Sequence, residues 1–171
     1  MPTRSVRVGK IARGTGPCHL SSDETGRWVF AANYVSGSIA VFSVKKNGAL
    51  KPASCVMRHG INSHAHFIRT APGNRFVLVC DLGLDTVFVY RFNAKNGKLT
   101  PHRPPGLKLK PGSGPRHFIF APSGRRVFVV NELDSTLSVF SWNGAAGVLK
   151  EIACVSTVPA DFKAPNTGSG I

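Results

Sequence analysis

Three consecutive segments with the same order of residue types constrain the fold of this chain more than any other feature. The segments begin at His19, His66 and His117, so the pattern recurs about every 50 residues, a spacing typical of repeated supersecondary units. Two further sets of positions correspond in the three segments: Asn33, Asp81 and Asn131, and Phe42, Tyr90 and Phe140. Such a repeat predicts neighbouring copies of one small unit that share a continuous core.

Each segment has the pattern of four short strands. In the third segment the expected strands are 117–120, 125–131, 136–142 and 148–156, and Gly, Pro, Asn and Asp residues separate them. Apolar runs broken by such turns indicate an antiparallel meander, and repeats of this length are typical of β-propeller blades. A β-sandwich is the competing architecture, but it does not require a repeat. We therefore predict an all-β fold, a β-propeller fragment of about three four-stranded antiparallel blades.

The predicted blades are residues 14–58, 61–110 and 112–158. Residues 6–13 are expected to be the outer strand of a preceding blade, and residues 159–171 the start of the connection to the next blade. Because so few blades do not close a ring, we expect the chain to be an interior piece of a larger propeller. Its end blades would then expose apolar faces, which favours self-association.

Polar residues gather at the junctions between the predicted blades. In an up-and-down meander the first strand begins at the edge where the second strand ends. Arg116 and His117 are therefore expected beside Asn131 and Glu132. The first strand of a blade is innermost, so these junctions surround the central channel. Polar groups at the mouth of an apolar scaffold favour a binding site there.

The chain is strongly basic, with a formal net charge of +14. Nucleic-acid binding is one interpretation, because basic proteins gain affinity by neutralising phosphates. The Lys and Arg residues are scattered along the sequence, however, and no basic tail or aromatic-basic motif is present, which argues against nucleic acid as a partner. The remaining interpretations are attraction of a small anionic substrate and an ordinary solvated surface.

The N-terminal residues contain no apolar segment of the kind found in secretory signals, and no apolar run is long enough to cross a membrane. The four cysteines form no Cys-x-x-Cys pair. Cys80 lies inside the apolar run FVLVC, where a small buried side chain is expected. We therefore predict a cytoplasmic protein with reduced thiols and no membrane partner.

Several motifs, taken in order, resemble the lactonase family of seven-bladed β-propellers. They are GPCHL, GRWVFAANYVSGSIAVF, HAHF, VLVCDLGLDTVFVYRF, GPRHF, VNELDSTLSVF, and VSTVPADF followed by NTG. The resemblance covers nearly all of this chain but about half of a full family member. The bacterial propeller-type 6-phosphogluconolactonase belongs to this family, and the fungal carboxymuconate lactonizing enzyme is a relative.

The resemblance implies a cytoplasmic enzyme that opens a lactone ring without a metal or other cofactor. The expected reaction is hydrolysis of 6-phosphogluconolactone to 6-phosphogluconate, a step of the pentose phosphate pathway, with a small anionic lactone as substrate. The alternatives are a lactone-forming cycloisomerase of the muconate type and a non-catalytic propeller segment that acts as a binding module.

The family resemblance also implies site residues. A histidine, an arginine and a glutamate are proposed for the muconate relative, and the matching positions here are His64 or His66, Arg116 and Glu132. Glu132 would activate water as a base, and its alternative is a solvated turn residue. Arg116 would hold an anionic group or stabilise an oxyanion, and its alternative is an ion pair with Glu132.

His64 and His66 flank an alanine, so on an extended segment they point the same way and can act as acid, base or hydrogen-bond donor. Paired histidines also suggest a metal, but no third ligand stands at a suitable spacing, and no metal is predicted. The remaining substrate-binding candidates are His19, His117, Asp81 and Asn131. For each of them we also expect a structural role, such as holding a turn by side-chain to backbone hydrogen bonds.

Overall fold

The computed structural model describes residues 14–170, which form three antiparallel sheets of four consecutive strands each. Sheet I contains β1 (Pro17–Ser22), β2 (Trp28–Asn33), β3 (Ser38–Ser43) and β4 (Cys55–Arg58). Sheet II contains β5 (Ala65–Thr70), β6 (Phe76–Asp81), β7 (Thr86–Asn93) and β8 (Lys98–Lys108). Sheet III contains β9 (Pro115–Phe120), β10 (Arg126–Asn131), β11 (Thr136–Asn143) and β12 (Val148–Ser156). The predicted all-β architecture of four-stranded antiparallel blades is confirmed.

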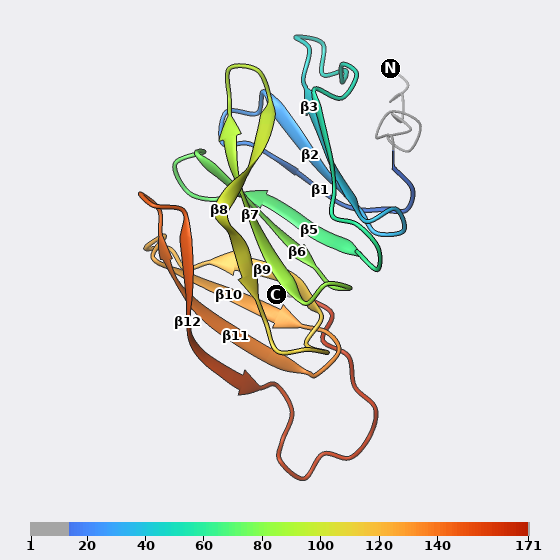
Figure 1. The fold of residues 1–171 in the computed structure, drawn as a ribbon, viewed down its shortest axis with the longest axis vertical. Coiled ribbons are helices and arrows are strands. Elements are labelled where there is room, and N and C mark those ends of the chain that lie inside the picture. The colour runs from blue at the N-terminus through green and yellow to red at the C-terminus, as the bar shows by residue number, and fades with distance from the viewer. Residues whose placement is uncertain (1–13, 171) are drawn as a thin grey trace.

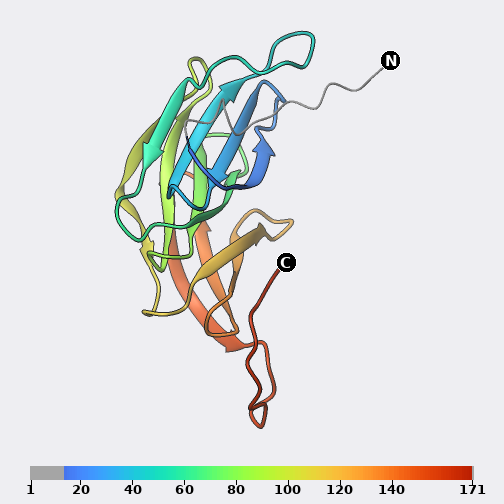
Figure 2. The same cartoon turned by 90° about the vertical axis from the view of Figure 1, so that its right-hand side faces the viewer.

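The sheets follow one another along the long axis of the molecule (Figures 1 and 2). The first strand of each sheet contacts the first strand of the next, β1 with β5 and β5 with β9. The first strands therefore share one side of the molecule, as the inner strands of propeller blades do. No helix in residues 14–170 is long and apolar enough to cross a membrane.

The core lies between the sheets. On β6, Val77 and Val79 pack in the cluster shared with sheet I, whereas Leu78 and Cys80 pack in the cluster shared with sheet III. Because successive side chains of a strand point to opposite faces, a sheet covered on both faces needs a continuous apolar run. This explains the run FVLVC, and it confirms the prediction that Cys80 is buried.

Each first strand contains an irregular position where it pairs with the second strand. The ladder skips one residue between Pro17 and His19, between Ala65 and Phe67, and between Pro115 and His117. His19, Phe67 and His117 consequently occupy equivalent positions, opposite Ala32, Cys80 and Val130. The alignment of His66 with His19 and His117 is therefore wrong by one residue. The skipped residues are Cys18, His66 and Arg116.

The remaining parts of the chain lie outside the sheets. The predicted outer strand at 6–13 lies outside the described residues. Residues 157–170 contain no strand and return to the turn between β10 and β11, where the backbone N–H of Gly168 donates to the carbonyl oxygen of Glu132 over 3.2 Å. Whether this segment leads to a further blade stays a prediction.

Candidate functional site

The three skipped residues of the first strands converge on one open pocket of about 390 Å³. Its lining includes Cys18, His66 and Arg116 together with Tyr34 and Glu132, which follow the second strands of sheets I and III. An extra residue in one strand leaves the ladder and re-aims its side chain. The structure thus brings together three of the predicted catalytic residues: His66, Arg116 and Glu132.

Arg116 and Glu132 form an ion pair in this pocket, with 2.6 Å between Nε and Oε2. The N–H of Arg116 is not directed at the carboxylate well enough for a hydrogen bond, so the contact is mainly electrostatic. Both side chains remain about a quarter exposed. The expected structural pairing is thus present, and both groups still face the pocket.

The backbone fixes the position of Glu132. Its N–H donates to the carbonyl oxygen of Gly114 over 2.8 Å, and the next residue, Leu133, donates to the carbonyl of Ser113 over 3.1 Å. These bonds join the turn after β10 to the junction before β9. The backbone that carries the Glu132 side chain is therefore fixed by the junction before β9.

His66 is an uncharged histidine at neutral pH. Its burial, reinforced by the positive charge of Arg116 and by His117 and His19, lowers its pKa from 6.5 to about 4. The edge of its ring meets Tyr34, with 5.8 Å between the ring centroids. A neutral imidazole can accept a proton or donate one N–H, but it cannot serve as a cationic acid.

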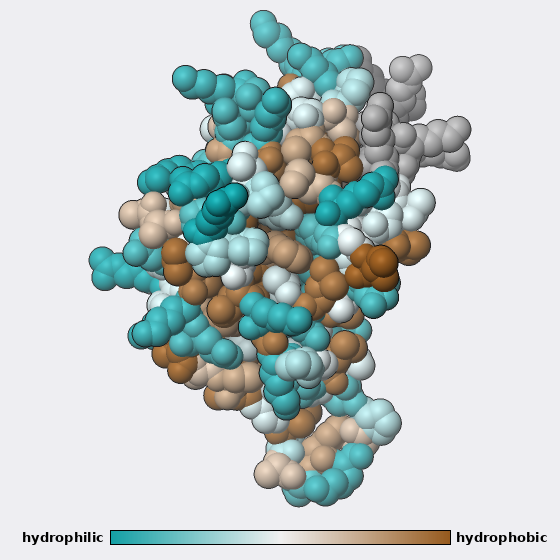
Figure 3. Space-filling model, viewed as in Figure 1, coloured by the Kyte–Doolittle hydropathy of each residue, from teal (hydrophilic) through white to brown (hydrophobic). Residues whose placement is uncertain are grey.

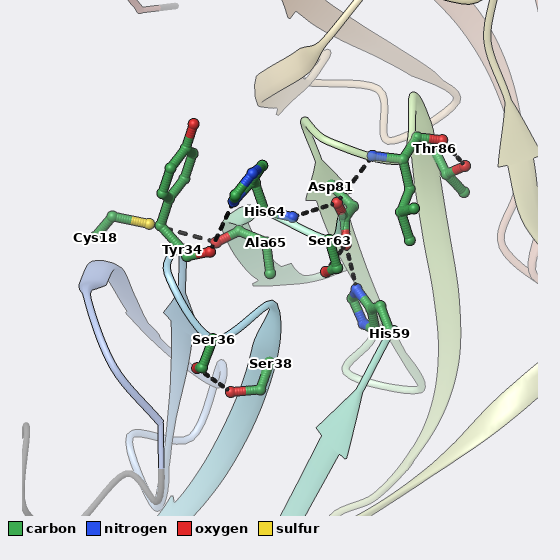
Figure 4. Close-up of polar contacts among 11 residues, drawn as sticks. Cys18, Tyr34, Ser36, Ser38, His59, Ser63, His64, Ala65, Asp81 and Thr86 are labelled. Carbon is green, nitrogen blue, oxygen red and sulfur yellow. Dashed lines mark hydrogen bonds and ion pairs between the residues drawn. The ribbon is translucent and has the colours of Figure 1, made fainter. Parts of the chain in front are cut away.

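His64 lies against Tyr34 rather than in the pocket lining (Figure 4). Its ring stacks on the Tyr34 ring with 4.5 Å between the centroids, and its Nδ1 lies 3.1 Å from the Tyr34 carbonyl oxygen. Its backbone N–H donates to Oδ1 of Asp81 over 2.8 Å. Both predicted histidines therefore contact Tyr34, but only His66 lines the pocket.

Asp81 and Asn131 are fully buried and hold the turns after the second strands. Asp81 accepts hydrogen bonds from the Ser63 hydroxyl and from two backbone N–H groups, those of His64 and Leu84 (Figure 4). Burial acts to raise the pKa of Asp81, but the hydrogen bonds from His59, Ser63 and the His64 backbone outweigh it and keep the pKa below 3.8.

The equivalent asparagines make the same kind of contact. The amide of Asn131 donates to the hydroxyls of Thr136 and Ser138, and that of Asn33 donates to Ser38. Such buried hydrogen bonds hold the turns after the second strands. This is the structural role that the sequence pattern predicts for Asp81 and Asn131. Neither Asp81 nor Asn131 lines the pocket.

His19 and His117 both pack against Phe67, with ring centroids 3.9 and 4.9 Å from its centroid. Nδ1 of His19 accepts the backbone N–H of Ile68 over 3.3 Å. Burial, with the nearby His117 and Arg69 charges, lowers the pKa of His19 to about 4. Burial and the Arg116 charge also lower the pKa of His117. Both rings therefore pack the inner strands beside the pocket, and neither lines it.

Tyr34 and Cys18 line the pocket but were not among the predicted site residues, although the repeat predicts that their junction lies at the same edge. Tyr34 directly follows Asn33, just as Glu132 directly follows Asn131, so the repeat itself places the two at equivalent positions. Cys18 donates to the carbonyl oxygen of His66 over 3.2 Å, which links the inner strands of sheets I and II. Residues 14–170 contain no group of three or more His, Cys, Asp or Glu side chains arranged to hold a metal.

Three blade-like sheets with a polar pocket at the edge of their inner strands define a partial β-propeller. Residues 5–171 match the family described as Lactonase, 7-bladed beta-propeller, and the chain belongs to this lactonase family. The resemblance that the sequence motifs indicate is thereby confirmed.

Named relatives are similar to this chain over almost its whole length. The 6-phosphogluconolactonase of Bacillus subtilis (strain 168) is 34% identical over 170 residues, which are 95% of this chain and 48% of that protein. A crystal structure of a putative 6-phosphogluconolactonase from Bacteroides fragilis is 34% identical, with a TM-score of 0.79, over 86% of this chain and 45% of that one. The structure of the Pseudomonas aeruginosa periplasmic gluconolactonase is 32% identical, with a TM-score of 0.80, over 86% of this chain and 44% of that one. The chain spans about half the length of the curated relatives it matches.

Proposed function

We propose that this chain supplies the catalytic pocket of a lactonase that hydrolyses a sugar lactone, with 6-phosphogluconolactone as the substrate. The observation that carries the proposal is the convergence of Arg116, Glu132 and His66 on one pocket. The names of the Bacillus and Bacteroides relatives support the choice of substrate.

In the proposed reaction, Glu132 takes a proton from water as the water oxygen bonds to the lactone carbonyl carbon. The carbonyl oxygen gains negative charge, which the guanidinium of Arg116 and one N–H of neutral His66 stabilise. The ring C–O bond then breaks, and the departing oxygen takes the proton from Glu132. The carbonyl re-forms, and the products are a carboxylic acid and a hydroxyl group; the acid releases its proton to solvent at neutral pH, and no cofactor is consumed.

The positive net charge of +14 supports an anionic substrate, because a basic surface raises the local concentration of anions and their rate of encounter. We also propose a cytoplasmic location, as the family resemblance implies, although the Pseudomonas relative is named as a periplasmic protein. Fractionation of the cells that produce the chain tests the location.

Self-association is part of the same proposal. The outer strand β12 leaves Ile152 and Val155 about half exposed, at 55% and 51%. Light scattering over a range of concentrations measures the mass in solution. A mass that stays monomeric at all concentrations would contradict self-association.

The lactonase proposal is tested by proton release, since ring opening gives an acid that ionises at neutral pH. The purified chain is given 6-phosphogluconolactone, with Glu132→Gln as the test variant and Glu151→Gln as the control. Glu151 is exposed on β12 and lies outside the pocket lining. We expect Glu132→Gln to lose about 100-fold or more of the wild-type rate, the usual contribution of a general base, and Glu151→Gln to keep it.

Other outcomes separate the alternatives. Equal rates for the wild type and Glu132→Gln would contradict the role of Glu132. Binding of 6-phosphogluconate without any turnover would favour the non-catalytic binding module. Ring closure of a muconate substrate without hydrolysis of the sugar lactone would favour the cycloisomerase.

A further inference from the structure

The two ends of the strands carry different charges. We use "site edge" for the end with the turns after β2, β6 and β10 and the junctions before β5 and β9. We use "far edge" for the opposite end, with turns 23–27, 71–75 and 121–125 and turns 44–54, 94–97 and 144–147. The site edge carries a balanced set of charges: Arg58, Lys108, Lys110 and Arg116 with Asp81, Asp85, Glu132 and Asp134.

The far edge is dominated by cations. Its exposed basic residues, in the turns and the adjoining strand ends, are Arg27, Lys45, Lys46, Lys51, Arg69, Arg75, Arg91, Lys95, Lys98, Arg125, Arg126 and Lys150. Its acids are Asp23, Glu24 and Glu151. Two of these acids are already engaged, Asp23 by the Asn74 amide and Glu24 by the backbone N–H of Gly73. Within residues 14–170, no carboxylate forms an ion pair with a far-edge cation.

The repeat explains how basic residues that are scattered along the sequence come together at the far edge. Arg27, Arg75 and Arg125 each stand directly before the second strand of their sheet, so each blade places one arginine at the same edge. Figure 3 shows hydrophilic side chains along the side of the molecule where the β1–β2, β7–β8 and β11–β12 turns lie. The scattering of Lys and Arg along the sequence therefore no longer argues against a polyanionic partner.

An open pocket of about 500 Å³ lies within the far edge of sheet II. Its lining contains Arg75, Arg91 and Lys95, and no carboxylate. The guanidinium groups of Arg75 and Arg91 lie over the ring of the buried Phe76, at 5.6 and 5.5 Å from its centroid. Arg75 also donates from Nη2 to the Ala145 carbonyl oxygen over 3.4 Å. Stacking on an aromatic ring holds a guanidinium in place and leaves its remaining N–H groups for an anion.

We propose that the far edge is a binding surface for the phosphodiester backbone of a nucleic acid, centred on the Arg75–Arg91–Lys95 pocket. Several arginines suit this partner, because the guanidinium matches the geometry of a phosphate group. Mutual repulsion of the unpaired cations is relieved when phosphates neutralise them and release counterions. Contacts to the backbone alone carry no base specificity, so binding is independent of sequence.

The surface chemistry favours nucleic acid over a membrane. Attachment to a lipid surface uses exposed apolar side chains that enter the headgroup region. Among the described residues, the six turns of the far edge contain none of the exposed large apolar side chains, and the adjoining strand ends contain two, Ile119 and Val148, which are 43% and 36% exposed. The far edge also lies at the other end of the strands from the proposed lactonase pocket, so binding there does not depend on lactone hydrolysis.

The test is fluorescence anisotropy with a short, mixed-sequence, fluorescein-labelled DNA duplex over a range of NaCl concentrations. The test variant is Arg75→Gln/Arg91→Gln/Lys95→Gln. The matched control, Lys108→Gln/Lys110→Gln/Lys163→Gln, removes the same charge outside the far edge. We expect the test variant to bind at least tenfold more weakly and to lose about two to three units of salt slope, and the control to keep its slope.

A second variant keeps the proposal testable if the first variant does not fold. Lys45→Gln/Lys46→Gln/Arg126→Gln changes exposed far-edge residues away from the Phe76 ring, and it should also lower the salt slope relative to the control. Equal losses in all variants would attribute binding to net charge and overturn the proposal. Absence of DNA binding by the wild-type chain, or tighter binding to phosphatidylserine vesicles than to DNA, would also overturn it.

Discussion

His59 and Asp81 form a buried hydrogen-bonded pair that joins the loop after sheet I to the second strand of sheet II. Nδ1 of His59 lies 2.5 Å from Oδ2 of Asp81, and the two side chains are 1% and 0% exposed. Ser63 donates to the same carboxylate oxygen. The backbone that leads from β4 to the pocket residue His66 is therefore held by one carboxylate.

Replacement of Asp81 by Asn should destabilise the chain by about 3 kcal/mol, because removal of one partner of a buried charged network leaves the other groups unsatisfied. The pKa of Asp81 lies below 3.8 in the folded chain. Its stabilising contribution is therefore complete above pH 3.8 and is lost as the pH falls through the folded pKa. Denaturant unfolding of Asp81→Asn should show less acid dependence than the wild type in that range.

The control for this prediction is Asp161→Asn, since Asp161 is exposed in the segment after β12. That variant should unfold like the wild type at neutral pH. If Asp81→Asn and Asp161→Asn have equal free energies of unfolding, the His59–Asp81 pair does not hold the sheets together.

The sequence repeat was sufficient to predict the strands and their antiparallel order, because turn residues and short apolar runs are local signals. It misplaced His66 by one position, since the histidine at 66 stands beside Phe67, which is the true equivalent of His19 and His117. An extra residue in a strand changes which side chain faces the pocket without changing the apolar pattern. Which residue of each first strand faces the pocket therefore depends on how that strand pairs with the second strand.

The pairing of Asp81 with His59 could not be predicted either. His59 lies in the loop after sheet I and Asp81 ends a strand of sheet II, and no local pattern connects the end of β4 with the end of β6. The pairing of Arg116 with Glu132, in contrast, followed from meander geometry, which places the start of the first strand beside the end of the second. Contacts within one blade were predictable, and contacts between blades required the packing of the sheets.

The lowered pKa of His66 predicts an unusual titration. NMR of the folded chain should give a midpoint of about 4 for His66, compared with 6.5 in the unfolded chain. Between these values the unfolded state binds more protons, so stability should fall as the pH is lowered from 6.5 towards 4, and His66→Gln should reduce that dependence. Arg116→Gln should move the His66 midpoint towards 6.5, because a positive charge is removed. An unchanged midpoint would exclude Arg116 as a contributor.

Tyr34 offers a test of how the pocket histidines are positioned. Tyr34→Phe keeps the ring that contacts His64 and His66, whereas Tyr34→Leu removes it. If the ring positions His66, Tyr34→Phe should keep the lactonase rate within about twofold and Tyr34→Leu should lose about tenfold or more in kcat/KM, since small misplacements of catalytic groups are costly. The NMR signals of His64 and His66 should shift more in Tyr34→Leu than in Tyr34→Phe, and this readout does not depend on activity. An equal loss of rate in both variants would assign the role to the hydroxyl group, and an unchanged rate in both would contradict a positioning role for Tyr34.

The packing of one sheet on the next is tested at two glycines in equivalent turns, Gly147 between β11 and β12 and Gly48 between β3 and β4. Both have a positive φ, 74° and 81°, so alanine introduces similar backbone strain at each. A Cβ at Gly147 would overlap the ring of Phe76 on sheet II, whereas a Cβ at Gly48 meets no atom within 4 Å. We expect Gly147→Ala to cost about 3 kcal/mol and Gly48→Ala about 1 kcal/mol in the free energy of unfolding, because only the first adds overpacking to the strain. Thermal and denaturant unfolding measure the difference, and equal losses would mean that Phe76 does not pack on the β11–β12 turn in solution.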